Sequence, residues 1–125
     1  AQVEGIIRRN NATPEYAAQF ALKCLRYQKK NKEFEINALF ITYEELCDNK
    51  ENVVAKIKSF IPELGDIDSD LEFSAHNFKT DGKMKIQNLN DEKINKLSTS
   101  QLVLINSYFN KEVDLLNYFG YSIIN

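Results

Sequence analysis

The sequence predicts an α/β protein, of which this chain supplies the mostly helical C-terminal part with one buried strand. Apolar residues recur at helical spacing over most of the chain, whereas one short apolar run, residues 38–42, shows no such spacing. Hydrophobic residues make up 43% and charged residues 27% of the 125 residues, as in an ordinary globular domain with a core. We therefore expect residues 1–125 to be part of a single domain without an internal boundary.

The first two helices are predicted from periodicity and capping. Residues 3–9 carry an apolar helical pattern that ends in two arginines. Thr13 and Pro14 then mark a helix start. A threonine hydroxyl can cap the first turn, and proline is tolerated there because the backbone N–H that it lacks would have no partner within the helix. Lysines follow near the end of this helix, where they suit its negative pole. Its expected apolar face runs to about Tyr27 and contains Tyr16, Ala17, Phe20, Ala21, Cys24 and Leu25.

The apolar run at residues 38–42 reads Ala-Leu-Phe-Ile-Thr and is predicted to be a strand covered on both faces. A single strand leaves its backbone hydrogen-bonding groups unpaired. We therefore expect its partners in a parallel sheet that continues into sequence upstream of residue 1.

The second half of the chain is predicted to return to helices. Asp48 and Glu51 have the spacing of a capping box, and the helix that follows should stop at Pro62. Residues 63–85 have the composition of a loop. Further helix starts are expected at Asn90 and at the capping box Ser98–Gln101, and Gly120 suits the end of the last helix. The residues expected to be largely buried are Phe40, Ile57, Leu102 and Phe119.

Three groups of residues could in principle bind a metal or catalyse a reaction, but for each of them neither role is predicted. Cys24 and Cys47 lie in apolar patterns and are interpreted as buried thiols rather than a disulfide, with no zinc-ligand spacing around them. The acidic run Asp66, Asp68 and Asp70 has Leu71 and Asn77 where a calcium loop needs glycine and glutamate. His76 is the only histidine, so neither a metal site nor a catalytic residue is predicted.

A lysine-rich loop is the remaining candidate site. Lys79, Lys83 and Lys85 surround Gly82, which would allow close approach of the backbone to an anionic ligand. The alternative is a solvated surface loop, and composition alone does not decide between them.

The segment from residue 38 to residue 64 resembles part of a known family. An apolar run leads into Tyr43-Glu44-Glu45-Leu46, a short acidic turn and an amphipathic helix, as in the C-terminal half of sulfotransferases that use 3′-phosphoadenosine-5′-phosphosulfate (PAPS). The tail around 115-LLNYFGYSI-123 is similar to the end of that family. The resemblance covers about residues 13–123, and the residues that carry it are Tyr43, Glu44, Leu46, Leu116, Phe119, Gly120 and Tyr121.

The resemblance implies a P-loop-like fold with a parallel sheet and transfer of a sulfuryl group from PAPS to an acceptor hydroxyl or amine. The family's phosphosulfate loop and acceptor-activating base lie upstream, so this chain alone is expected to be inactive. The family's loop that covers the nucleotide corresponds in order to residues 76–85. The resemblance therefore implies that Lys79, Gly82 and Lys83 contact the donor, although lysine stands where the family commonly has arginine.

A second function class fits the same helical pattern, namely a non-catalytic helical protein-interaction module. The predicted strand favours the sulfotransferase, because a self-contained helical module has no need of a strand. The net charge of −2 favours neither nucleic acid nor anionic lipid as a partner. No apolar run reaches the roughly 20 residues of a membrane helix. The two cysteines, interpreted as thiols, favour a reducing compartment, and a cytoplasmic location is expected.

Overall fold

The computed structural model describes residues 1–34, 37–68 and 85–124, and within these ranges every regular element is a helix. The α/β prediction is therefore wrong for the part of the chain that the structure describes, because it contains neither a sheet nor the strand expected at residues 38–42. The described residues fall into two compact units, Ala1–Ala38 with Leu89–Asn125, and Leu39–Asn88. The expectation of one domain stays a prediction, since a compact unit need not fold independently.

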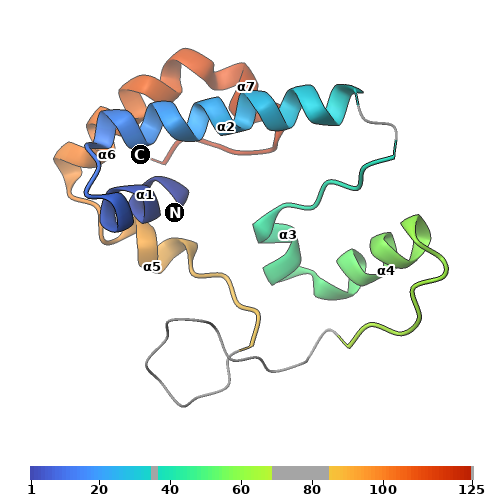
Figure 1. The fold of residues 1–125 in the computed structure, drawn as a ribbon. Coiled ribbons are helices and arrows are strands. Elements are labelled where there is room, and N and C mark those ends of the chain that lie inside the picture. The colour runs from blue at the N-terminus through green and yellow to red at the C-terminus, as the bar shows by residue number, and fades with distance from the viewer. Residues whose placement is uncertain (35–36, 69–84, 125) are drawn as a thin grey trace. The chain divides into compact units, whose positions relative to one another are not determined.

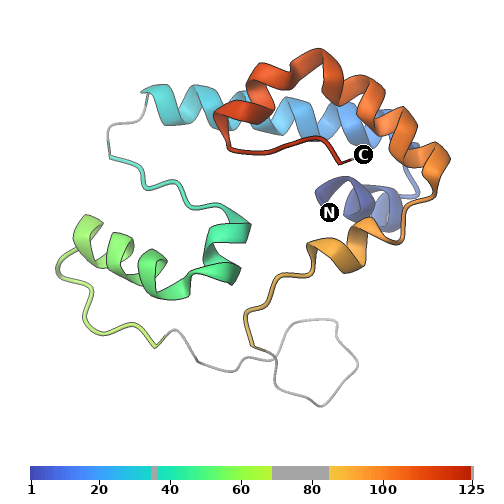
Figure 2. The same ribbon diagram turned by 180° about the vertical axis from the view of Figure 1, so that it is seen from behind.

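The first unit is built around one long helix. α1 (Gln2–Asn10), α2 (Pro14–Phe34), α5 (Asn90–Ile94), α6 (Thr99–Phe109), the 3₁₀ turn η1 (Asn110–Glu112) and α7 (Val113–Tyr118) belong to it. Both views show α6 and α7 running beside α2, with α1 near the N-terminal end of α2 (Figures 1 and 2). α2 thus supplies the surface on which the other helices pack.

Two groups of buried side chains form the core of this unit, and both include residues of α2. Small residues allow α1 and α6 to approach α2 closely, whereas leucines join α2 to α7. The first group contains Val3, Ala17, Ala18, Ala21 and Ile105, and the second contains Leu22, Leu25, Leu115 and Leu116.

The predicted helix ends in this unit are confirmed except at Asn90, which is the first residue of α5 rather than its N-cap. Thr13 Oγ1 accepts a hydrogen bond from the backbone N–H of Tyr16 at 3.3 Å, directly before Pro14. The capping box of Ser98 and Gln101 has both of its hydrogen bonds, 3.2 and 2.9 Å long. Gly120 follows α7 with a φ of 74°, a left-handed conformation that glycine adopts without strain. Each of these signals acts within a few residues of the helix end that it marks.

The second unit contains two consecutive helices, α3 (Tyr43–Asp48) and α4 (Lys50–Phe60). The predicted cap is displaced by one residue, because Asn49 Oδ1, rather than Asp48, accepts the N–H of Asn52 at 3.3 Å. α4 ends before Pro62, as predicted. Val53 is its buried residue, at 1% exposure.

The segment predicted as a strand is an irregular connection in the structure. A strand needs hydrogen bonds to a neighbouring strand, and the described residues provide no such neighbour. The run instead ends at Thr42, whose Oγ1 accepts the N–H of Glu45 at 3.1 Å and thereby starts α3. Phe40, Ile57, Leu102 and Phe119, which were expected to be largely buried, are each of intermediate burial.

An exposed ion pair joins the last turn of α4 to the segment that follows it and provides a test of the local geometry. Lys58 Nζ donates to Asp66 Oδ1 at 2.8 Å. This hydrogen bond, together with the lysine charge, lowers the pKa of Asp66 below its ordinary value. Any stability that the pair adds is fully present when the pH is above the pKa of Asp66 in the unfolded chain. It is lost as the pH falls through the lower pKa of Asp66 in the folded protein.

We therefore expect Lys58→Ala to raise the pKa of Asp66 while changing the stability of the protein little, because solvent screens an exposed ion pair. A carboxyl-carbon NMR titration of both proteins measures the pKa directly. Lys50→Ala, on the first turn of the same helix, is the control. Equal Asp66 titration midpoints in wild type and Lys58→Ala would show that this contact does not form in solution.

Candidate functional site

A line of exposed side chains runs along α2 and is the candidate functional surface of the first unit. Its members are spaced four, three, four, three and four residues apart, which places them on one side of a helix. Two lysines alternate with aromatic residues in its C-terminal half. This surface, called the α2 stripe below, consists of Tyr16, Phe20, Lys23, Tyr27, Lys30 and Phe34.

The α2 stripe lies on the side of the helix opposite its core. Successive side chains of a helix point about 100° apart around its axis. On this geometry the six stripe residues point to one side of α2, and its buried residues point to the opposite side. The buried residues of α2 are Ala17, Ala18, Ala21, Leu22 and Leu25. The stripe is therefore not required for packing within this unit.

The four rings of the stripe are unusually accessible for aromatic side chains. Tyr16 is 55% exposed, Phe20 42%, Tyr27 58% and Phe34 71%. Tyr16 and Phe20 stack on each other with their ring centres 6.0 Å apart. Single exposed apolar residues are common, but an aligned set of them is typical of a surface that binds another molecule.

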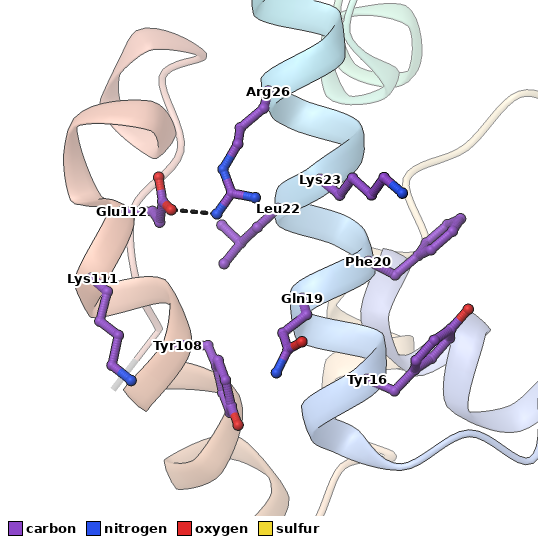
Figure 3. A pocket seen from close by; sticks show the side chains of 9 residues that line it. All are labelled: Tyr16, Gln19, Phe20, Leu22, Lys23, Arg26, Tyr108, Lys111 and Glu112. Carbon is purple, nitrogen blue, oxygen red and sulfur yellow. Dashed lines mark hydrogen bonds and ion pairs between the residues drawn. The ribbon is translucent and has the colours of Figure 1, made fainter.

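A groove beside the stripe separates α2 from α6 and η1 (Figure 3). Its volume is about 570 Å³, and Tyr16, Phe20 and Lys23 stand on its outer side, away from η1. Across the groove, Arg26 is paired with Glu112, so the positive charge of Arg26 is locally neutralised. The groove therefore combines the aromatic rings of Tyr16, Phe20 and Tyr108 with the positive charges of Lys23 and Lys111.

Other lysines of α2 already contact aromatic rings of the same unit. The ammonium groups of Lys29 and Lys32 lie 4.8 and 5.2 Å from the centre of the Tyr118 ring. Such cation–π contacts contribute about 0.5–1 kcal/mol at exposed sites. In the stripe, by contrast, Lys23 and Lys30 stand beside rings on the outer face.

The site predicted from the family resemblance is not covered by the structure. Lys79, Gly82 and Lys83 lie outside the described residues, as do His76 and Asp70. Cys24 and Cys47 are free thiols, as predicted, but each is only partly buried. No cluster of three potential metal ligands occurs among residues 1–34, 37–68 and 85–124.

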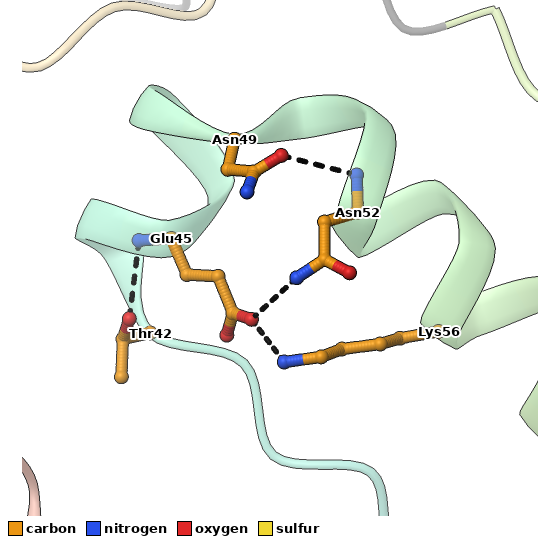
Figure 4. Close-up of polar contacts among 5 residues, drawn as sticks. All are labelled: Thr42, Glu45, Asn49, Asn52 and Lys56. Atoms are coloured by element: carbon orange, nitrogen blue, oxygen red, sulfur yellow. Dashed lines mark hydrogen bonds and ion pairs between the residues drawn. The ribbon is translucent and has the colours of Figure 1, made fainter.

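The Tyr-Glu-Glu-Leu motif has structural contacts in the second unit (Figure 4). The Glu45 carboxylate accepts hydrogen bonds from Lys56 and from Asn52 Nδ2, the latter at 3.4 Å, and so ties α3 to α4. The hydroxyl of Tyr43 donates to the carbonyl of Gln87 at 2.9 Å. These contacts account for Tyr43 and Glu45 without a ligand.

Comparisons with protein-family models, with curated proteins and with solved structures found no match to this chain. None of the described helices is both long and apolar enough to cross a membrane.

The prediction for the outer face of α2 was wrong. It placed Tyr16 and Phe20 with the core, but the structure exposes both and buries Ala18 and Leu22 instead. The signal that could have located the stripe is the regular spacing of three and four residues that continues from Tyr16 through the lysines to Phe34. Two apolar patterns overlap on this helix, and only packing decides which one faces inward.

Proposed function

We propose that this chain is a helical protein-interaction module that binds another polypeptide through the α2 stripe. The observation that carries the proposal is the line of four exposed aromatic rings on the side of α2 opposite its core. Removing those rings from water would stabilise a complex in the same way that burial of apolar surface stabilises a fold. Aromatic residues are also enriched among the residues that dominate binding energy.

The shape of the stripe favours a polypeptide over a small molecule. From Tyr16 to Phe34 it is roughly 27 Å long, because each helical residue advances by about 1.5 Å. Anchors spaced three and four residues apart match the side of a partner helix. A compact ligand would cover only one or two of the four rings.

The absence of a strand from the described residues supports this function over sulfuryl transfer. The strand was the feature that distinguished an α/β enzyme from a self-contained helical module. PAPS as a donor, an acceptor substrate, the remainder of a sulfotransferase domain and a cytoplasmic location all stay predictions, because no described residue bears on them.

Site-specific photo-cross-linking tests the proposed function. Tyr27 is replaced by the photoreactive analogue p-benzoylphenylalanine in the full chain expressed in its native cell. We expect cross-links from this position to a second polypeptide chain, which mass spectrometry identifies. The control carries the analogue at Val103, an exposed position on α6.

The cross-links should disappear when Phe20→Ala and Phe34→Ala are added, since these remove neighbouring anchors of the same surface. Cross-links that form only within the chain, or equally at position 103, would contradict a binding role for the stripe.

A further inference from the structure

The residues of the α2 stripe are ordered so that a second, antiparallel copy of α2 would place complementary side chains opposite one another. An antiparallel helix placed beside α2, with its midpoint level with residue 25, brings the two ends of the stripe together. Tyr16 then faces the partner's Phe34, Phe20 faces the partner's Lys30, and Lys23 faces the partner's Tyr27. Both lysines of the stripe are thus opposite an aromatic ring, and neither is directly opposite another lysine of the stripe.

The spacing of the stripe also suits a pair of helices. Alternating steps of three and four residues average about 3.5 residues, which is the repeat that keeps one seam of a helix facing a partner helix. α2 has 21 residues, so the whole stripe fits within one uninterrupted helix. The second helix can approach because the core of the unit lies on the opposite side of α2.

The positions of the lysines favour one of the two possible orientations. In a parallel pair, Lys23 and Lys30 would each face their own copies, and like charges brought together oppose association. In the antiparallel pair each ammonium group faces a ring, an arrangement that Lys29 and Lys32 already show with Tyr118. Arg26, beside the centre of the pair, is neutralised by Glu112 of its own chain.

We propose that the partner of the α2 stripe is a second copy of this chain, docked with the two α2 helices antiparallel and their midpoints at residue 25. This inference rests on the proposed function and adds the identity and orientation of the partner. Because the seam is one helix wide, we expect a reversible dimer with a dissociation constant of roughly 1–100 μM.

Sedimentation velocity of the full chain over a range of concentrations tests the dimer. Wild type should pass from monomer to dimer, and Phe20→Ala combined with Tyr27→Ala should raise the dissociation constant at least about tenfold. Val103→Ala is the matched control, because that residue is exposed on another helix. Circular dichroism should show unchanged helix content, since none of these side chains is in the core. A wild type that stays monomeric at every concentration would overturn the inference.

Cross-linking of the stripe ends tests the orientation. In a background of Cys24→Ser and Cys47→Ser, proteins carrying Tyr16→Cys or Phe34→Cys are treated with a short bis-maleimide, separately and as a mixture. We expect cross-linked dimers in the mixture only. Cross-links within either protein alone would indicate parallel helices, and none in any sample would exclude the antiparallel pair. A monomer that nevertheless photo-cross-links to a different protein through Tyr27 would overturn this inference and leave the proposed function standing.

Discussion

Leu22→Ala is expected to lower the free energy of unfolding by about 2–5 kcal/mol. Leu22 is 3% exposed and belongs to the leucine group that joins α2 to α7. Removing its side chain loses apolar burial and leaves a cavity that rigid helices fill only in part. Urea denaturation followed by circular dichroism measures the change.

Val103→Ala provides the control for Leu22→Ala. Val103 is 66% exposed on α6, and truncation of such a surface side chain usually changes stability by no more than about 0.5 kcal/mol. A loss below about 1 kcal/mol for Leu22→Ala would contradict the packing of α2 against α7.

Ala18→Leu is expected to destabilise the protein by about 1–3 kcal/mol for the opposite reason. Ala18 has no exposed surface and lies in the group of small residues shared by α1, α2 and α6. A larger side chain there must push neighbouring helices apart or adopt a strained conformation. Thermal and urea denaturation should both show the loss.

The matched control for Ala18→Leu is Gln28→Leu, which adds leucine to the same helix at an exposed position. Leucine favours helix formation, so the control should be neutral within about 0.5 kcal/mol. Ala18→Leu behaving like this control would show that residue 18 faces solvent, and the assignment of the two faces of α2 would then be reversed.

Local signals were the part of the fold that could be predicted from sequence. Thr13 with Pro14, Ser98 with Gln101, and Gly120 act through hydrogen bonds or backbone preferences within a few residues, so the same interactions appear in the structure. The shift of one cap from Asp48 to Asn49 shows the limit of this reasoning. Both side chains can cap a helix, but Asp48 is the last residue of α3, so Asn49, which lies between α3 and α4, caps α4.

The fold class could not be predicted because it depended on whether residues 38–42 have a neighbouring strand, which their own sequence does not reveal. An apolar run such as residues 38–42 is compatible with a buried strand or with a partly buried connection. Only a neighbouring strand distinguishes them, and none is present among the described residues. The inner face of α2 was misjudged for a related reason, since Tyr16 and Phe20 carry strong apolar signals although they are exposed, whereas Ala18 carries a weak one although it is fully packed.

The exposure of the α2 stripe in solution tests the central claim most directly. The chain contains no tryptophan, so Tyr27→Trp introduces a single fluorescent reporter in the middle of the stripe. As protein concentration rises through the micromolar range, the emission should shift to shorter wavelength and acrylamide quenching should weaken, because a second α2 helix covers the ring. A reporter that stays fully exposed at every concentration, or that is already shielded in the most dilute sample, would contradict an α2 stripe that is covered by a second copy of the chain.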